Sequence, residues 1–358
     1  MRLWGERSIV AELTKLQVLT STRIARFLRV SQTEVVKAIQ WVRSSGILVS
    51  PLFQPRRMGL KRVVVRVDLR GVGRARKEIV NRFIKCPEVY RVFKTFSGDI
   101  VVVVDQPLSA EIAVRGPRWE VIGVLESFVR SIPSRAELVR MAIERSVEKL
   151  IEETCRMESD SDVRNYAMET LLSGDVEKFD WVDLEIADVC YRRPEISLKE
   201  LASELRNRGV NKTTSVERHV SHSERLMSGY GTTFIRGLSE ALAVFEAPSL
   251  SNVLDLVESP MLSQIVYPGR FGRPLVLFRT LSTKLFDTVA ALEELGLRLV
   301  ETLDVRSGVY LSIPSKGSGY SSVNGWNELR PLPLVMKSVL EGVEIQSLEA
   351  SASSRKRP

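Results

Sequence analysis

The apolar positions near the start of the chain repeat with a helical period and indicate three short helices in succession. The spacing predicts helices over Arg7–Lys15, Ser21–Leu28 and Gln32–Ser45, separated by tight turns. Gly46 ends the third helix, because glycine readily adopts the left-handed conformation found just beyond helix ends. Three short helices in this order are typical of a helix-turn-helix unit.

The third of these helices has a well-marked start and two distinct faces. Ser31 and Glu34 make a capping box, in which each side chain bonds the backbone amide of the other. Val35, Ile39 and Val42 form an apolar stripe that must face the other helices. The opposite face carries Thr33, Lys37, Gln40 and Ser44. Such a face suits a helix lying in the major groove of DNA, where amides read adenine and lysine reads guanine or phosphate; an ordinary solvated face is the alternative.

The segment that follows is rich in cations. Ile47–Phe53 is predicted as a strand, and a loop with proline and glycine then leads to a return strand, which is the pattern of a basic wing. We expect phosphate contacts from the wing and from the start of the second helix, and base contacts from the third. The candidate residues are Arg56, Arg57, Lys61 and Arg62 in the wing, Ser21, Thr22, Arg23, Arg26 and Arg29 around the second helix, and Gln32, Thr33, Lys37 and Gln40 in the third.

The positive charge of the chain belongs to this first unit. The 358 residues contain 52 Lys and Arg against 44 Asp and Glu, for a formal net charge of +8. Residues 1–62 hold twelve basic and three acidic residues, a net charge of +9. Localised positive charge favours a polyanion such as double-stranded DNA, because each neutralised phosphate releases condensed counterions. A solvated basic face is the simpler alternative. From Glu144 to Asp188 the balance reverses, with fourteen acidic and five basic residues, which indicates a boundary or linker.

Several kinds of chemistry have no support in the sequence. No apolar run approaches the roughly 20 residues that span a bilayer, and the start lacks the apolar region of a signal peptide, so we expect a soluble protein of the cytoplasm. Cys86, Cys155 and Cys190 form no C-x-x-C pair, and no phosphate-binding P-loop is present. His219 and His222 have the spacing of half a metal site, but no second pair of ligands is evident. We therefore expect no metal, no cofactor and no enzymatic activity.

The helix-turn-helix pattern resembles that of the leucine-responsive and asparagine-synthase regulator (Lrp/AsnC) family of transcription regulators. The matching residues are Ile24-Ala25, then Val35, Ile39 and Val42, and finally Gly46. The following Lys61–Leu69 strand, Gly73–Cys86 helix and Val89–Val104 hairpin resemble the first half of the family's β-α-β-β-α-β effector domain, with Trp119–Ile132 as its second helix. The resemblance implies effector binding near the turn at Gly98 and Asp99, for which a plain hairpin turn is the alternative.

The same plan recurs in the second half of the chain. Phe179–Asp188 resembles the first helix of the family and Ile196–Ala202 the entry to the second, while Val216 and Val220 take the places of Val35 and Ile39. This copy is more divergent, since a serine stands at the next apolar position and the closing glycine is missing. Its outer face presents Thr214, Arg218, Ser221 and Arg225, and its contact with DNA is left open. The strands and helices predicted after it are Leu242–Phe245, Leu250–Glu258, Leu262–Tyr267, Pro274–Phe278, Lys284–Leu295 and Arg298–Val305, with a further strand at Val309–Ile313.

The predicted fold class is α+β, a winged helix-turn-helix plus a ferredoxin-like (βαββαβ) effector domain, repeated in tandem. The predicted parts are a winged helix-turn-helix over 1–62, an effector-type domain over 63–143, an acidic helical connector over 144–178, a second helix-turn-helix over 179–237, a second ferredoxin-like domain over 238–314, and a C-terminal extension with a disordered tail over 315–358. Family members dimerise through their effector domains, so the repeat implies a pseudo-dimer within one chain, itself able to form a homodimer.

The function implied is that of a sequence-specific DNA-binding transcription regulator, modulated by a small-molecule effector such as an amino acid. Siroheme decarboxylases offer an enzymatic alternative, because they share this architecture and use His and Arg near the effector-domain cleft. Both histidines of this chain lie instead in the predicted second recognition helix. A ligand-sensing scaffold without DNA binding is the third hypothesis.

Overall fold

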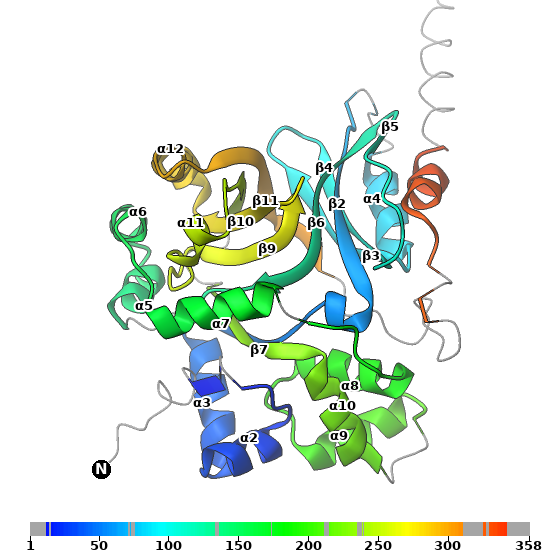
Figure 1. The fold of residues 1–358 in the computed structure, drawn as a ribbon, viewed down its shortest axis with the longest axis vertical. Coiled ribbons are helices and arrows are strands. Elements are labelled where there is room, and N and C mark those ends of the chain that lie inside the picture. The colour runs from blue at the N-terminus through cyan, green and yellow to red at the C-terminus, as the bar shows by residue number, and fades with distance from the viewer. Residues whose placement is uncertain are drawn as a thin grey trace, which may run out of the picture.

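Eight antiparallel strands close into one barrel-like sheet in the computed structural model (Figure 1). The strand order around it is β2-β4-β3-β11-β8-β10-β9-β6, and β6 pairs back with β2. The structure describes residues 12–13, 16–70, 72, 76–132, 136–172, 174–210, 215–234, 238, 240–310, 325–326 and 329–341. The predicted α+β class is therefore observed, with one closed sheet in place of two separate ones. Among the residues described, no helix is long and apolar enough to cross a membrane.

Each half of the chain contributes four neighbouring strands to the barrel. The first half supplies β2 (Leu60–Val67), α4 (Arg76–Lys85), β3 (Val89–Thr95), β4 (Ile100–Pro107), the short β5 (Arg115–Gly116) and β6 (Trp119–Val129). The second half supplies β8 (Ala241–Glu246), α11 (Ser251–Leu254), β9 (Leu262–Arg270), β10 (Arg273–Thr280), η4 (Ser282–Lys284), α12 (Leu285–Glu294) and β11 (Arg298–Tyr310). The halves join edge to edge through β3 with β11 and β6 with β9, all within a single chain.

The second half follows the predicted order of strands and helices, whereas the first half departs from it. The segment predicted as a helix over Trp119–Ile132 is mostly the strand β6, so that prediction is wrong. The predicted strand at Val309–Ile313 continues β11 as far as Tyr310, and residues 311–313 lie outside the described part. A helix over residues 332–341 packs beside α4 on the outer face of the first half, where Leu332, Val335 and Met336 join its core (Figure 1).

Two helical units lie side by side below the barrel (Figure 1). We call α2 (Ser21–Leu28), α3 (Gln32–Ser44) and β1 (Ile47–Phe53) the first helical unit. The second helical unit comprises α8 (Trp181–Arg192), α9 (Leu198–Asn207), α10 (Val216–Arg225) and β7 (Met227–Phe234). The predicted capping box of Ser31 and Glu34 is confirmed at the start of α3, and a second one stands at Ser197 and Glu200 of α9. The predicted helix over Arg7–Lys15 falls mostly outside the described residues.

The strand that ends each helical unit pairs with its counterpart in the other. β1 and β7 form a separate antiparallel two-stranded sheet, with Ile47 opposite Phe234 and Val49 opposite Thr232. The predicted wing, in which the strand after α3 pairs with the next strand along the chain, is therefore wrong, because that next strand is β2 of the barrel. The helix α5 (Ala136–Ile143) precedes the predicted connector over 144–178, which holds α6 (Val147–Cys155) and α7 (Ser161–Leu172). The helix α7 lies between the barrel and the helical units (Figure 1).

Candidate functional site

The interior of the barrel holds a cavity that both halves of the chain line. The space between its walls is about 790 Å³ when the part that opens to solvent is included. We call it the barrel cavity. Its lining residues are Arg62, Val64, Tyr90, Arg91, Phe93, Val101, Val103, Ile122, Leu125, Phe128, Arg130, Leu242, Val244, Ser263, Gln264, Val266, Leu275, Leu277, Arg279 and Leu303.

Alternation along the strands explains why this set faces inward. Successive side chains of a strand point to opposite faces of the sheet. On β2, Arg62 and Val64 face the cavity, whereas Val63 and Val65 pack outward beneath α4 and the 332–341 helix. The first half-sheet is therefore buried on both faces, and its inward positions combine apolar residues with arginine. The wall of the cavity holds four arginines and no Asp or Glu among the residues that the structure describes.

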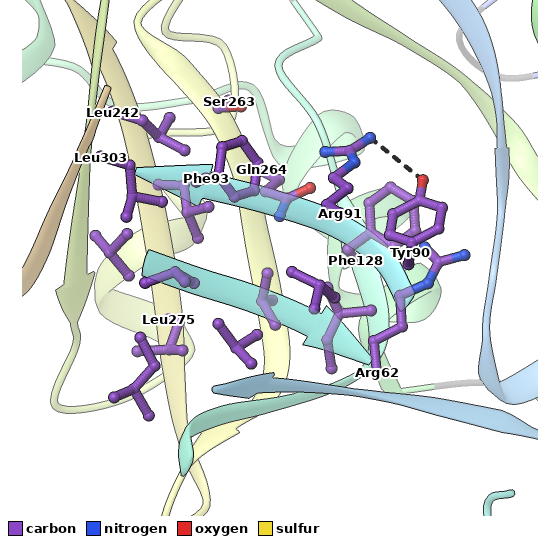
Figure 2. A pocket seen from close by; sticks show the side chains of 18 of the residues that line it. Arg62, Tyr90, Arg91, Phe93, Phe128, Leu242, Ser263, Gln264, Leu275 and Leu303 are labelled. Carbon is purple, nitrogen blue, oxygen red and sulfur yellow. Dashed lines mark hydrogen bonds between the residues drawn. The ribbon is translucent and has the colours of Figure 1, made fainter. Parts of the chain in front are cut away.

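One end of the barrel cavity is cationic and aromatic (Figure 2). The guanidinium of Arg62 lies 3.6 Å from the centre of the Tyr90 ring, and its Nε donates to Asp105 Oδ1 at 3.0 Å. Arg91 Nη2 donates to the Tyr90 hydroxyl at 3.2 Å. Burial raises the pKa of Asp105, and Arg62 opposes that shift. Leu242, Leu275 and Leu303 lie toward the other end of the view (Figure 2), where Arg279 stands opposite Leu242 in the sheet and donates to Ser263 Oγ at 3.4 Å.

Tyr191 of α8 adjoins this cationic end from the second helical unit. Arg91 Nη2 donates to its hydroxyl at 3.4 Å. Burial opposes ionisation of the phenol, but the positive charges of Arg130 and Arg91, with hydrogen bonds from Arg130 and Tyr90, lower the pKa of Tyr191 to about 7. Arg130 also donates from Nη1 to Ser50 Oγ at 2.7 Å, which fixes its position. A phenol that titrates near neutral pH is suited to giving and taking a proton.

The arrangement is suited to an anion with an apolar body. Guanidinium groups bind carboxylates with two parallel hydrogen bonds, and the interaction strengthens when water is excluded. Thirteen of the twenty lining residues are apolar, so the same cavity covers a large hydrophobic surface. An eight-stranded barrel is wide enough to hold one small ligand.

Three of the residues predicted to read DNA bases share one exposed face, since Thr33, Lys37 and Gln40 lie on α3 opposite the buried Val35, Ile39 and Val42. Gln32 is exposed in the first turn of α3 and donates from Nε2 to the Ser21 Oγ at 3.2 Å. The apolar stripe is confirmed, and base contact stays a prediction.

The residues of the predicted second helix are largely taken up by contacts with the second helical unit. Ser21 is buried, and the Thr22 hydroxyl accepts from the backbone N–H of Leu198. Arg23 donates to Glu224 at 2.7 Å, and Arg26 lies 3.6 Å from Glu217. A phosphate contact by Ser21 is thus incompatible with its burial, and Arg23 already has an anionic partner. Arg26 and Arg29 are exposed, so their role as phosphate contacts stays a prediction.

The wing cations also lie elsewhere than predicted. Arg62 is buried inside the barrel and paired with Asp105, so it cannot contact a phosphate. Arg57 donates to the backbone carbonyls of Arg225 and Met227, which joins the two helical units. Arg56 is partly exposed beside Glu126, and Lys61 is a partly exposed residue of β2. Because β2 belongs to the barrel, these four cations do not form a wing.

The remaining predicted sites are scattered. Arg218 and Arg225 are exposed on α10, the Ser221 hydroxyl donates to the Glu217 carbonyl, and Thr214 lies outside the described residues. Gly98 and Asp99 form the turn between β3 and β4, and Gly98 has a φ of 99°. A plain hairpin turn was the alternative to an effector site at these residues. Neither lines the barrel cavity, and effector binding at the turn stays a prediction.

The residues that line the cavity were not predicted from the sequence, apart from Arg62, for which we expected a phosphate contact. The available signal was an arginine inside an apolar strand, as at Arg91, or directly after one, as at Arg130. A buried arginine needs a partner or a function. Tyr191 carries no such signal, because only the fold brings α8 to the barrel.

Comparison with known proteins gives limited similarity. No protein-family model and no curated protein matches the chain. A crystal structure of the siroheme decarboxylase NirDL aligns with a TM-score of 0.37 and 14% identity over 96% of this chain and 100% of that chain. A second, of NirDL in co-complex with an iron-uroporphyrin III analogue, aligns with a TM-score of 0.38 and 12% identity over 87% and 95%. The expectation that the chain is not an enzyme is contradicted by this finding, since both structures are those of an enzyme.

Proposed function

We propose that the barrel cavity binds an amphipathic polycarboxylate, of the class of siroheme and related tetrapyrroles, and that the chain removes carboxyl groups from it. In this proposal the helical units are of the helix-turn-helix type, with β1 and β7 paired to each other in place of a wing hairpin. The half-sheets are ferredoxin-like domains packed as an Lrp/AsnC-like pseudo-dimer within one chain. The observation that carries the proposal is the cavity itself, in which Arg62, Arg91 and Tyr90 lie together in a largely apolar wall built by both halves.

The arginines serve binding and orientation. Arg91 and Arg130 stand beside the cavity with Tyr191 between their charges, whereas the charge of Arg62 is balanced by Asp105. Carboxylates on the edge of a large ring would meet Arg91 and Arg130, while the ring covers the leucine, valine and phenylalanine side chains. A charge-assisted hydrogen bond of this kind contributes about 1.5–3 kcal/mol to binding, or roughly 10- to 100-fold in affinity.

Tyr191 supplies the proton that decarboxylation requires. An acetate side chain loses CO₂ when the bond between its methylene and carboxyl carbons breaks and leaves the electron pair on the methylene carbon. The conjugated ring of the substrate stabilises that pair, and protonation converts the methylene to a methyl group. The Tyr191 hydroxyl donates this proton and regains one from water, so the step consumes one proton, releases CO₂ and involves no redox change. A pKa of about 7 suits a general acid at neutral pH.

Incubation of the whole chain with siroheme under anaerobic conditions tests this function. Titration followed by the absorbance of the chromophore measures binding, and mass spectrometry of the extracted pigment measures loss of CO₂. Arg91→Leu is expected to weaken binding by roughly 10- to 100-fold, and Tyr191→Phe to keep binding while lowering turnover by about 100-fold or more. Arg298→Ala is the matched control, because Arg298 is exposed and paired with Glu246 away from the cavity.

The outcomes separate binding from catalysis. Equal affinity in Arg91→Leu and wild type would place the ligand elsewhere. Saturable binding without any loss of CO₂ would retain the cavity as a ligand site but remove decarboxylation. Binding of a free amino acid such as leucine, in place of the tetrapyrrole, would favour an effector-responsive regulator.

A second function, binding of double-stranded DNA, is favoured by α3. Its exposed face presents an amide, a hydroxyl and an ammonium group at helical spacing, from Gln40, Thr33 and Lys37. DNA binding would use the exposed face of α3, whereas decarboxylation would use the barrel cavity, so each function can be tested independently of the other.

A further inference from the structure

A buried carboxylate and two imidazoles meet in the second helical unit, and none of the three residues lines the barrel cavity. Asp183 lies in the first turn of α8, and His219 and His222 stand one turn apart on α10. Nδ1 of His219 lies 2.8 Å from Asp183 Oδ1, and Nδ1 of His222 lies 3.6 Å from Asp183 Oδ2. One ligand atom from each of the three residues fits within 4.8 Å of the others. The sequence showed only the two histidines, because Asp183 is 36 residues away.

The surroundings of Asp183 make a charged partner necessary. Its side chain is 1% exposed, and its neighbours Val182, Leu184 and Ile186 belong to the apolar core. A carboxylate buried in this way is costly unless it is paired or coordinates a metal. Oδ2 accepts from the backbone N–H of Asp180 at 2.8 Å in the cap of α8, and each oxygen also has an imidazole nitrogen within 3.6 Å.

We propose that Asp183, His219 and His222 bind a divalent transition-metal ion of the zinc class. Ligands of one tetrahedral zinc ion at about 2.0–2.2 Å lie roughly 3.3 Å from one another. The imidazole nitrogens lie 2.8 Å from Asp183 Oδ1 and 3.6 Å from Oδ2, and one ligand atom of each residue lies within 4.8 Å of the others, so the side chains must draw together to reach that spacing. Asp180, whose Oδ1 is 3.6 Å from His219 Nδ1, or a water molecule completes the set.

The donor atoms select the ion. Two imidazole nitrogens and a carboxylate suit zinc, cobalt, nickel or copper, whereas magnesium and calcium prefer oxygen ligands alone. The histidine rings are partly exposed, at 16% and 29%, so an ion has access from solvent. Bound there, the ion ties the first turn of α8 to α10 and stabilises the second helical unit. The site shares no residue with the barrel cavity.

Titration of the whole chain, first treated with a chelator, with Co²⁺ tests the site through the visible d–d absorption of tetrahedral cobalt, and competition with Zn²⁺ then gives the zinc affinity. We expect one ion per chain and a rise in Tm with Zn²⁺. His222→Ala and Asp183→Asn are each expected to weaken binding by roughly tenfold or more. Ser221→Ala is the matched control on α10 and should bind as the wild type does, because its hydroxyl bonds only within the helix.

His222→Ala keeps the test decisive if Asp183→Asn fails to fold, since His222 is the most exposed of the three groups. Absence of stoichiometric Co²⁺ binding would overturn the proposal, and so would equal affinity in wild type and His222→Ala. Magnetic-resonance signals of both imidazoles that shift together with added Zn²⁺ would support it independently of affinity.

Discussion

The hydroxyl of Tyr191 accepts a hydrogen bond from Nη2 of Arg91 at 3.4 Å, across 100 residues of sequence. Tyr191 belongs to α8 of the second helical unit, and Arg91 belongs to β3 and lines the barrel cavity. The contact therefore joins the helical layer to the interior of the barrel. A ligand anion that binds Arg91 offsets part of its positive charge and therefore also changes the electrostatic potential at the Tyr191 hydroxyl.

The first prediction concerns the pH dependence of Tyr191. Its pKa of about 7 lies below the ordinary value near 10, so the ionised phenol stabilises the folded state. This stabilisation is complete above the pKa of the unfolded chain and is lost as the pH falls through about 7. Phenolate absorbance of the wild type should show one tyrosine that titrates near pH 7, and Tyr191→Phe should remove it.

Tyr166→Phe provides the control for that titration, because burial raises the pKa of Tyr166 and moves its ionisation to higher pH. A wild-type titration curve that Tyr191→Phe leaves unchanged near pH 7 would show that the guanidinium groups do not act on this phenol.

The second prediction concerns the ion pair between Arg62 and Asp105. Both side chains are 3% exposed, so Asp105→Asn leaves a buried guanidinium without its counter-charge and should cost about 3–5 kcal/mol of unfolding free energy. The matched control is Asp68→Asn, which should cost far less because its partner Arg70 is exposed and solvent screens the pair. Denaturant unfolding measures both variants, and equal losses in the two would contradict burial of the Arg62 pair.

The third prediction concerns the helix over residues 332–341. Met336 is fully buried against the first half-sheet, whereas Leu334 on the same helix is 53% exposed. Met336→Ala should lower the unfolding free energy by about 2–5 kcal/mol, and Leu334→Ala should change it by less than about 0.5 kcal/mol. If Met336→Ala were as mild as Leu334→Ala, the helix would not cover the sheet.

The fourth prediction concerns DNA binding by α3. Lys37→Ala should weaken binding to all duplexes alike and reduce the salt dependence by about one counterion. Gln40→Ala should change sequence preference by about 1–3 kcal/mol at one base pair. Fluorescence anisotropy with labelled duplexes measures both, and Lys337→Ala, an exposed cation on the far helix, is the control. No retention of DNA by the wild type at low salt would remove this function and leave the cavity untouched.

Local pattern was sufficient for the second half of the barrel and for the helices α2 and α3. The strands β8 to β11 and the helix α12 were predicted because each carries its own alternation or helical period, and the cap at Ser31 depends only on residues three positions apart. The helix predicted over Trp119–Ile132 failed because β6, buried in part on both faces, shows no clear alternation.

The pairing of β1 and the closure of the cavity depend on contacts between distant segments, which local sequence pattern does not reveal. β1 pairs with β7 about 180 residues later, and nothing in Ile47–Phe53 distinguishes that partner from the next strand along the chain. The cavity depends on edge pairing of two halves, so Arg91 and Leu242 become neighbours of one space only when the barrel closes. Arg62 was predicted to contact DNA because it belongs to a basic segment, and composition cannot show on which face of a strand a cation lies.

The most direct test of the central claim is a crystal structure of the chain with siroheme bound. We expect density for the ring inside the barrel, against the apolar lining residues. The peripheral carboxylates should contact the guanidinium groups of Arg91 and Arg130, and one of them should lie within reach of the Tyr191 hydroxyl. Density for the ligand outside the barrel, or an empty barrel at saturating ligand, would contradict it.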